Sequence, residues 1–102
     1  MTKFALYGKV LAQPGQRDAL VEVLLEAARM LADMPECELY FVNTVPDESD
    51  AIWVTELWTS EEAHARSLDR DDVRALIQRG RPLIADMAEQ VRLAPVGGKG
   101  LQ

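Results

Sequence analysis

Residues 37–58 read CELYFVNTVPDESDAIWVTELW, and this stretch decides the fold. Two runs rich in aromatic and β-branched residues, 37–45 and 51–58, flank the polar connection 46–50. Runs of this composition are typical of strands, and the connection between them has the length of a hairpin loop. The stretch therefore predicts two strands that pair as antiparallel neighbours.

The chain before this hairpin predicts a strand followed by a helix. Residues 3–12 are rich in β-branched and aromatic residues, and residues 13–16 carry the turn signal Gln-Pro-Gly-Gln. Residues 17–34 place polar and apolar side chains on opposite stripes at helical spacing. Proline cannot continue a helix, so this one should stop at Pro35.

The chain after the hairpin predicts helices and then a last strand. Thr59 and Glu62 fit a capping box that would start a short helix. Apolar residues at helical spacing run from Asp71 to Met87, with a kink or split expected at 80–82, where Gly-Arg-Pro interrupts the pattern. Residues 89–95 predict the final strand.

The resulting order is β-α-β-β-α-β, which predicts an α+β fold of ferredoxin-like topology. Two helices can cover one face of a four-stranded antiparallel sheet. We expect a single domain over residues 1–95. Residues 96–102, which include Val-Gly-Gly-Lys-Gly, predict a flexible tail.

Both faces of the predicted sheet are apolar, which indicates a homodimer. A sheet that is wet on one side alternates between apolar and polar residues. Here the face turned away from the helices would carry Tyr7, Phe41, Trp53 and Leu57. Monomers rarely expose an apolar patch of this size, and a second copy of the same sheet would cover it.

Composition narrows the possible partners. The 102 residues carry a formal net charge of −6, which disfavours nucleic acid and anionic membrane surfaces. There is no apolar run long enough to span a membrane and no signal-peptide layout, so we expect a cytoplasmic protein. One histidine and one cysteine, His64 and Cys37, cannot form a closed zinc site. No metal and no other cofactor is predicted.

The segment Glu-Leu-Trp-Thr-Ser-Glu-Glu-Ala-His at 56–64 resembles the E-x-W-x-S-x-E-A segment of the antibiotic biosynthesis monooxygenase domain family. Tyr-Gly-Lys-Val at 7–10, Pro-Gly at 14–15 and Cys-Glu-Leu-Tyr at 37–40 fit the same pattern. The resemblance covers nearly the whole chain and implies a dimeric α/β barrel.

The resemblance also implies three alternative functions. The first is a cofactor-independent monooxygenase that acts on a small aromatic or quinol-like compound with molecular oxygen. The second is a haem-binding or haem-degrading relative, in which His64 would be an axial ligand. The third is a small-ligand-binding or stress-associated dimer without turnover.

His64 is the first candidate catalytic residue. An imidazole titrates near neutrality, so it can deprotonate a phenolic hydroxyl as a general base. The alternative is a partly buried histidine that hydrogen-bonds a neighbour. The family often carries its histidine three positions later, where this chain has Ser67.

Glu56 and Trp58 share one face of their strand, two residues apart. If this face meets the helices, a Glu56 carboxylate is costly there unless it is paired or neutralised. It could act at a raised pKa or bind a ligand hydroxyl; the alternative is a salt bridge to Arg81 or Arg92. Trp58 could stack on a flat ligand or be an ordinary core residue.

Three further residues are candidate substrate contacts. Gly8, in the middle of a strand, is typical of a bulge or of a close approach by a ligand. Tyr40 could hydrogen-bond a substrate oxygen or simply pack across the sheet. Tyr40 and Asn43 point to opposite faces of their strand, so at most one of them can line a given pocket.

Overall fold

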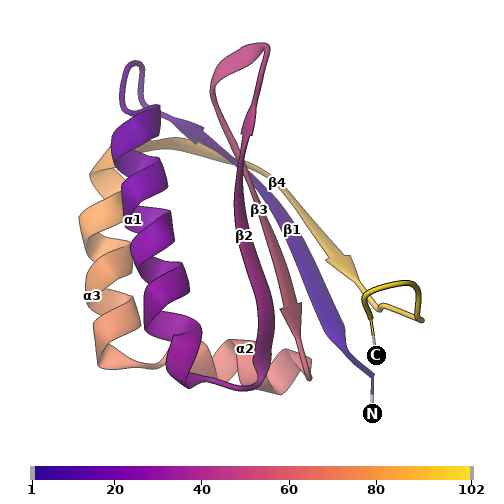
Figure 1. Ribbon diagram of the computed structural model, residues 1–102. Helices are drawn as coiled ribbons and strands as arrows, with labels where there is room; N and C mark the ends of the chain where they lie inside the picture. Colours follow the sequence, from indigo (N-terminus) through magenta and orange to yellow (C-terminus); the bar gives the residue numbers. More distant parts are fainter. Residues whose placement is uncertain (1, 102) are drawn as a thin grey trace.

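A four-stranded antiparallel sheet forms one layer of the protein, and all the helices lie on one side of it (Figure 1). The computed structural model describes residues 2–101. Its elements are β1 (Phe4–Ala12), α1 (Arg17–Met30), β2 (Cys37–Val45), β3 (Glu48–Trp58), α2 (Glu61–Ser67), α3 (Asp71–Gly80) and β4 (Ile84–Leu93). Two short 3-10 helices, η1 (Leu31–Asp33) and η2 (Arg81–Leu83), follow α1 and α3.

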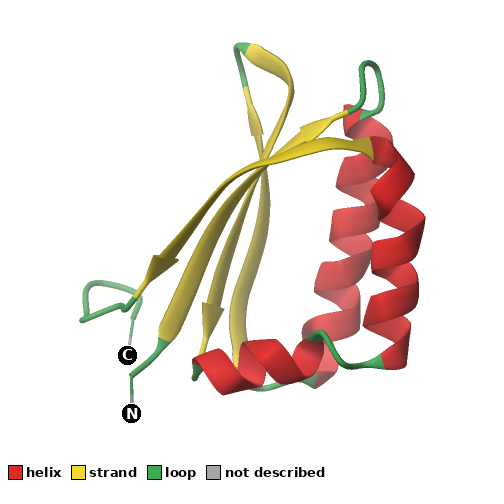
Figure 2. Ribbon diagram, turned by 180° about the vertical axis from the view of Figure 1, so that it is seen from behind, coloured by secondary structure: helices red, strands yellow, loops and turns green. Residues whose placement is uncertain are grey.

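The strand order is β2-β3-β1-β4, and every neighbouring pair is antiparallel. This arrangement confirms the predicted ferredoxin-like α+β fold. Helices α1 and α3 run side by side over the sheet, and α2 lies across one end of it (Figure 2). The β2–β3 hairpin was predicted with the correct partners, although its connection is shorter than expected. β3 begins at Glu48, so only Pro46 and Asp47 remain in the turn.

The predicted capping box is wrong by one residue. Ser60, and not Thr59, is the N-cap of α2, and its side-chain oxygen accepts a hydrogen bond from the Ala63 amide at 3.1 Å. Ser60 is extended, as N-cap residues are. The Thr59 amide instead donates to the Glu36 carbonyl, and Thr59 lies between the end of β3 and the N-cap.

The break expected at 80–82 is confirmed, but the predicted return to helix after it, as far as Met87, is wrong. α3 ends at Gly80, η2 contains Pro82, and β4 begins at Ile84, five residues before the predicted strand. Ile84 pairs with Ala12 in the sheet. The apolar spacing of residues 83–87 imitates a helix because β4 has a register shift there, which breaks the usual alternation. Similarly, α1 ends at Met30, and η1 completes the segment predicted as helix to 34.

The core is divided into two clusters at the two ends of the sheet. One surrounds Trp58 and the other surrounds Leu20, and both side chains are almost fully buried. Tyr40 packs against both clusters. Residues of both clusters, among them Leu20 and Trp58, line the space between the sheet and the helices.

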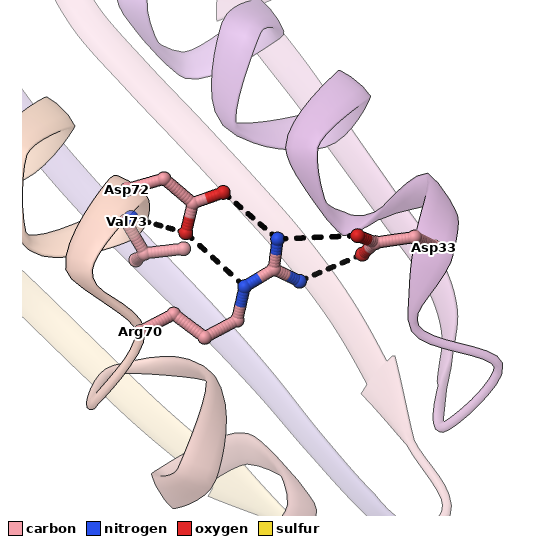
Figure 3. Close-up of polar contacts among 4 residues, drawn as sticks. All are labelled: Asp33, Arg70, Asp72 and Val73. Carbon is pink, nitrogen blue, oxygen red and sulfur yellow. Dashed lines mark hydrogen bonds and ion pairs between the residues drawn. The ribbon is translucent and has the colours of Figure 1, made fainter.

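Arg70 fixes the junction of α2 and α3 to the end of α1 (Figure 3). Its guanidinium donates to both carboxylate oxygens of Asp33, at 2.7 and 3.3 Å, and to both of Asp72, at 3.1 and 2.8 Å. Asp72 in turn accepts the Val73 amide at 2.8 Å. Paired hydrogen bonds from a planar guanidinium fix the orientation of the two carboxylates as well as attracting them. The cluster therefore holds the start of α3 beside the end of α1.

The face of the sheet turned away from the helices carries the predicted apolar patch. The pairing register places Thr55 between Tyr7 and Phe41, and places Trp53 between Lys9 and Asn43. Tyr7 and Phe41 are 41% and 56% exposed in the single chain. Trp53 and Leu57 are half-buried.

Candidate functional site

An apolar cavity of about 620 Å³ lies between the inner face of the sheet and the helices. This volume is in the range of pockets that hold drug-sized ligands. Leu, Val, Ile and Ala side chains of α1, α3, β1 and β4 form most of its wall. Its polar and aromatic members are Tyr40, Glu56, Trp58, His64, Ser67 and Arg81.

β3 brings Glu56 and Trp58 to one end of this cavity. Glu56 pairs with Leu6 on one side and with Tyr40 on the other, while Trp58 pairs with Phe4 and is fully buried. The expected inward face is therefore present, and the indole Nε1–H of Trp58 donates to Glu56 Oε1 at 3.0 Å.

α2 brings His64 back over the end of β3. The helix begins three residues after Trp58, so its second turn lies above the tryptophan. The His64 ring stands edge-on to Trp58 with 5.3 Å between centroids, and lies 5.4 Å from the ring of Phe4. These two aromatic rings fix the imidazole, which lines the cavity and is 17% exposed.

Glu56 is a buried carboxyl that accepts a hydrogen bond from a neutral donor, the indole N–H of Trp58. Burial raises the pKa of Glu56 above its usual range, and the hydrogen bond from Trp58 partly offsets this rise. Neither alternative partner, Arg81 or Arg92, forms an ion pair with it among residues 2–101. Arg92 instead pairs with Glu61, and its guanidinium lies 5.8 Å from the centre of the Phe4 ring.

The surroundings of His64 favour its neutral imidazole form. Burial and then the positive charge of Arg92 lower the pKa of His64, and the negative charge of Glu61 opposes them. Its Nε2 lies 3.8 Å from Glu56 Oε1, beyond a direct hydrogen bond. A neutral ring nitrogen beside a carboxyl can accept a proton, and the carboxylate can then stabilise the imidazolium that forms.

Tyr40 and Cys37 border the same carboxyl. Burial, and then the charge of Glu56, raise the pKa of Tyr40, so its hydroxyl stays protonated and can donate to a ligand. The same two causes raise the pKa of Cys37 to about 11, and its thiol lies 3.7 Å from the Leu39 carbonyl. The thiol is therefore protonated at neutral pH and packs as a small apolar group.

Gly8 and Asn43 do not line the cavity. Gly8 lies on the inner face, where an added Cβ would be 3.9 Å from the Glu89 carbonyl, an ordinary contact distance. Asn43 lies on the outer face and donates to the Trp53 carbonyl at 3.0 Å and the Thr55 hydroxyl at 3.3 Å. The expected separation of Tyr40 from Asn43 is thus confirmed, with Tyr40 on the cavity side.

Two lining residues were not assigned to the site from the sequence. Ser67 is 3% exposed, and its hydroxyl donates to the His64 carbonyl at 2.6 Å. Its position, where the family often has histidine, was the available signal. Arg81 was considered only as a partner for Glu56, because the segment that follows it was predicted as helix and not as strand β4.

Within residues 2–101, no three His, Cys, Asp or Glu side chains come together as a metal site would require. None of the helices described has both the length and the apolar character needed to cross a membrane.

Replacing Glu56 by glutamine is expected to make stability less sensitive to rising pH. The folded-state pKa of Glu56 is raised, so its contribution to stability is present at low pH and is lost as the pH rises through that value. Glutamine keeps an acceptor for Trp58 and cannot ionise. Urea unfolding at pH 5 and pH 8 measures the free energy of unfolding. Between these pH values, the difference between the variant and the wild type should shift in favour of the variant. Glu22→Gln, at an exposed position of α1, should follow the wild type; equal behaviour of the two variants would contradict the prediction.

The chain is similar in sequence and in fold to known proteins. A family model described as Antibiotic biosynthesis monooxygenase matches residues 4–79. A solved structure from Chloroflexus aurantiacus J-10-fl, which carries the name of an antibiotic biosynthesis monooxygenase, is 46% identical, with a TM-score of 0.88. The match covers 98% of this chain and 99% of that chain.

More distant structures share the fold. One from Caulobacter crescentus CB15, named for the same activity, is 23% identical with a TM-score of 0.86, covering 94% of this chain and 92% of that chain. SnoaB, a cofactor-independent oxygenase from Streptomyces nogalater, is 14% identical with a TM-score of 0.83, covering 98% and 99%. No curated protein matches the chain.

Proposed function

Since this chain belongs to the antibiotic biosynthesis monooxygenase family, we propose that it is a cofactor-independent monooxygenase acting on a small aromatic, quinol-like compound. One observation carries the proposal. A neutral imidazole, His64, faces the buried carboxyl of Glu56 at one end of a cavity that is otherwise almost wholly apolar. A flat phenol fits such a space, with its hydroxyl at His64.

The proposed reaction begins with a proton transfer. The phenolic O–H of the substrate gives its proton to Nε2 of His64, and Glu56 stabilises the imidazolium. Trp58 keeps the carboxylate oriented through its N–H, and Tyr40 can donate to a second substrate oxygen. The dry wall of the cavity strengthens these charge interactions and keeps water away from the reacting ring.

The phenolate then reacts with molecular oxygen. It passes one electron to O₂, and the resulting radical pair forms a C–O bond at the ring. The peroxide takes back the proton that His64 holds, and loss of water then breaks the O–O bond and leaves an oxygenated quinone. A hydroquinone and O₂ thus give a hydroxyquinone and H₂O. All four electrons that reduce O₂ come from the substrate, so no external reductant enters the balance.

Oxygen uptake tests this proposal. Purified protein, without added cofactor, is mixed with a panel of hydroquinones and hydroxyanthrones in an oxygen electrode. We expect catalysed uptake with at least one of them, and ¹⁸O₂ should place one labelled atom in the product and one in water. Uptake no faster than in buffer across the whole panel would reject the proposal and leave the non-catalytic binding dimer as the better reading.

The haem alternative has a separate readout. Haemin titrated into the protein would give a Soret band shifted by an axial imidazole if His64 were a ligand. The neighbours of the His64 ring do not favour this, because its Nε2 faces Glu56 at 3.8 Å and both Phe4 and Trp58 flank the ring.

We also propose that the protein is a homodimer formed through the outer face of the sheet. The exposed rings of Tyr7 and Phe41 support this, because covering them removes apolar surface from water. Light scattering at micromolar concentration should give twice the 11.4 kDa chain mass. Phe41→Asp should shift the mass to that of one chain. Val96→Asp changes an exposed apolar residue outside the sheet and should leave the dimer intact; a wild-type monomer would refute the proposal.

A further inference from the structure

The imidazole of His64 packs against a pair of aromatic rings from neighbouring strands. Phe4 of β1 is the direct antiparallel partner of Trp58 of β3, and both side chains belong to the same core cluster. Side chains that face each other in this way interact closely and stabilise the sheet as a pair. The centroid of the His64 ring lies 5.4 Å from that of Phe4 and 5.3 Å from that of Trp58. The imidazole therefore rests on a cross-strand aromatic pair.

The two rings of this pair differ in their relation to the cavity. Trp58 is part of the cavity wall, whereas Phe4 is not. Phe4 is 7% exposed and contacts the His64 ring from outside the wall. A change of Phe4 can therefore alter the environment of the imidazole without removing a surface that a ligand in the cavity would touch. Phe4 is the residue through which the orientation of His64 can be studied apart from ligand binding.

Phe4 is also connected to the helix that carries His64. The guanidinium of Arg92, on β4, lies 5.8 Å from the centroid of the Phe4 ring, within the range of a cation–π contact. Arg92 forms an ion pair with Glu61, in the first turn of α2. This ion pair is exposed and contributes little by itself. The buried ring of Phe4 is the fixed part of the arrangement, and His64 packs directly on it.

The orientation of the His64 ring depends on these contacts between rings. A histidine base is commonly oriented by a carboxylate that hydrogen-bonds one of its nitrogens. Here Nε2 of His64 lies 3.8 Å from Glu56 Oε1, which is too far for such a bond. The backbone of α2 places the Cβ of His64 and leaves its two side-chain torsions to be fixed by packing. A ring that turns away from the cavity cannot reach the proton that it has to accept.

We propose that Phe4 is a positioning residue for His64, because its ring, together with that of Trp58, holds the imidazole toward Glu56 and the cavity without touching the substrate. The consequence for turnover rests on the proposed function. A group that only orients the base should affect proton transfer and leave substrate binding as it is. Its removal then lowers kcat and kcat/KM equally, with KM unchanged.

Nuclear magnetic resonance of the imidazole tests the positioning directly. His64 is the only histidine of the chain, so its ring signals are assigned without ambiguity. Relaxation of the ring ¹³C nuclei gives an order parameter, which is high for a rigid group and low for a mobile one. We expect a rigid ring in the wild type and a markedly lower order parameter in Phe4→Leu and Phe4→Met, which keep a large apolar side chain without a ring. Phe4→Tyr keeps the ring and should keep the order.

Steady-state oxygen uptake measures the consequence for turnover. Phe4→Leu should lower kcat about tenfold to a hundredfold with KM unchanged, as a misplaced catalytic group does, and Phe4→Tyr should retain most of the rate. Ile52→Ala is the control for a loosened core. Ile52 is fully buried, lies outside the cavity wall, and precedes Trp58 along β3 by roughly 20 Å. At a temperature where it is folded, this variant should keep both the order of the His64 ring and the rate.

The outcomes distinguish this inference from the proposed function. A His64 ring that is mobile in the wild type, or equally ordered in the wild type and Phe4→Leu, would overturn the inference. A loss of ring order in Ile52→Ala as large as that in Phe4→Leu would also overturn it. Ring order that depends on Phe4, without oxygen uptake by any phenol, would reject the monooxygenase and keep the positioning of the imidazole. Oxygen uptake that is equal in the wild type and Phe4→Leu would keep the monooxygenase and reject the role of Phe4.

Discussion

His64→Ala is expected to lower turnover by about a hundredfold to ten-thousandfold, the range that a positioned general base contributes. The imidazole is the only neutral base at the cavity among residues 2–101, and alanine removes the group that receives the phenolic proton. The free energy of unfolding should change far less, by about 1 kcal/mol, because the ring is partly exposed and donates no side-chain hydrogen bond to any of residues 2–101. Steady-state oxygen uptake and urea unfolding measure the two effects.

Two further readouts separate a base from a merely structural side chain. In the wild type, activity should fall as the pH drops through the lowered pKa of His64, and this acid limb should be absent in the variant. Added imidazole should restore part of the rate by entering the space that the ring leaves. Arg66→Ala, on the exposed side of the same helix, should retain full activity. An unchanged rate in His64→Ala would remove this residue from the mechanism.

Trp58→Ala should cost about 3–5 kcal/mol of the free energy of unfolding, as truncation of a buried large aromatic residue does. Trp58 is fully buried, forms the centre of one core cluster, and gives Glu56 its hydrogen-bond donor. The loss is a large share of the roughly 5–15 kcal/mol that holds a small domain together. Denaturant unfolding at fixed protein concentration measures it.

Matched variants show whether the loss of stability in Trp58→Ala comes from the burial of the side chain or from its position in the cavity wall. Trp58→Phe keeps an aromatic ring and removes the N–H, so it should cost less than alanine. Met87→Ala lies on the same cavity but is 53% exposed, and should cost under about 1 kcal/mol. A cost for Trp58→Ala no larger than that for Met87→Ala would mean that the tryptophan belongs to the ligand site and adds little to the core.

The periodicity of apolar residues and the positions of turn signals along the sequence were sufficient to predict the topology. The hairpin of β2 and β3 was readable because apolar runs flank a polar turn, and the inward face of α1 was readable from its apolar stripe. The region after Gly80 was not readable in this way. Residues Leu83, Ile84 and Met87 keep helical spacing, and the pairing with β1 that makes this segment a strand comes from residues over 70 positions earlier. Long-range pairing overrides local pattern at this point.

The candidate site was predictable where one short segment contains it. Glu56, Trp58 and His64 lie within nine residues, so strand alternation and one helical turn were enough to bring them together. Arg81 and Ser67 come from other segments, and their place in the cavity depends on how α2 and α3 pack over the sheet. No local pattern encodes that packing. The hydrogen bond from Trp58 to Glu56 likewise depends on side-chain rotamers that sequence spacing does not specify.

The central position of β1 sets the order in which the sheet can be built during synthesis. Phe4 pairs with Trp58, and Ala5 pairs with Leu93, so both neighbours of β1 leave the ribosome long after it does. At roughly 5–20 residues per second, β1 waits several seconds for β4, whereas the hairpin of β2 and β3 can close at once. During this interval both edges of an apolar strand are open to other chains. We therefore expect the newly made chain to be more prone to aggregation than the folded protein, and to be the form that needs a chaperone.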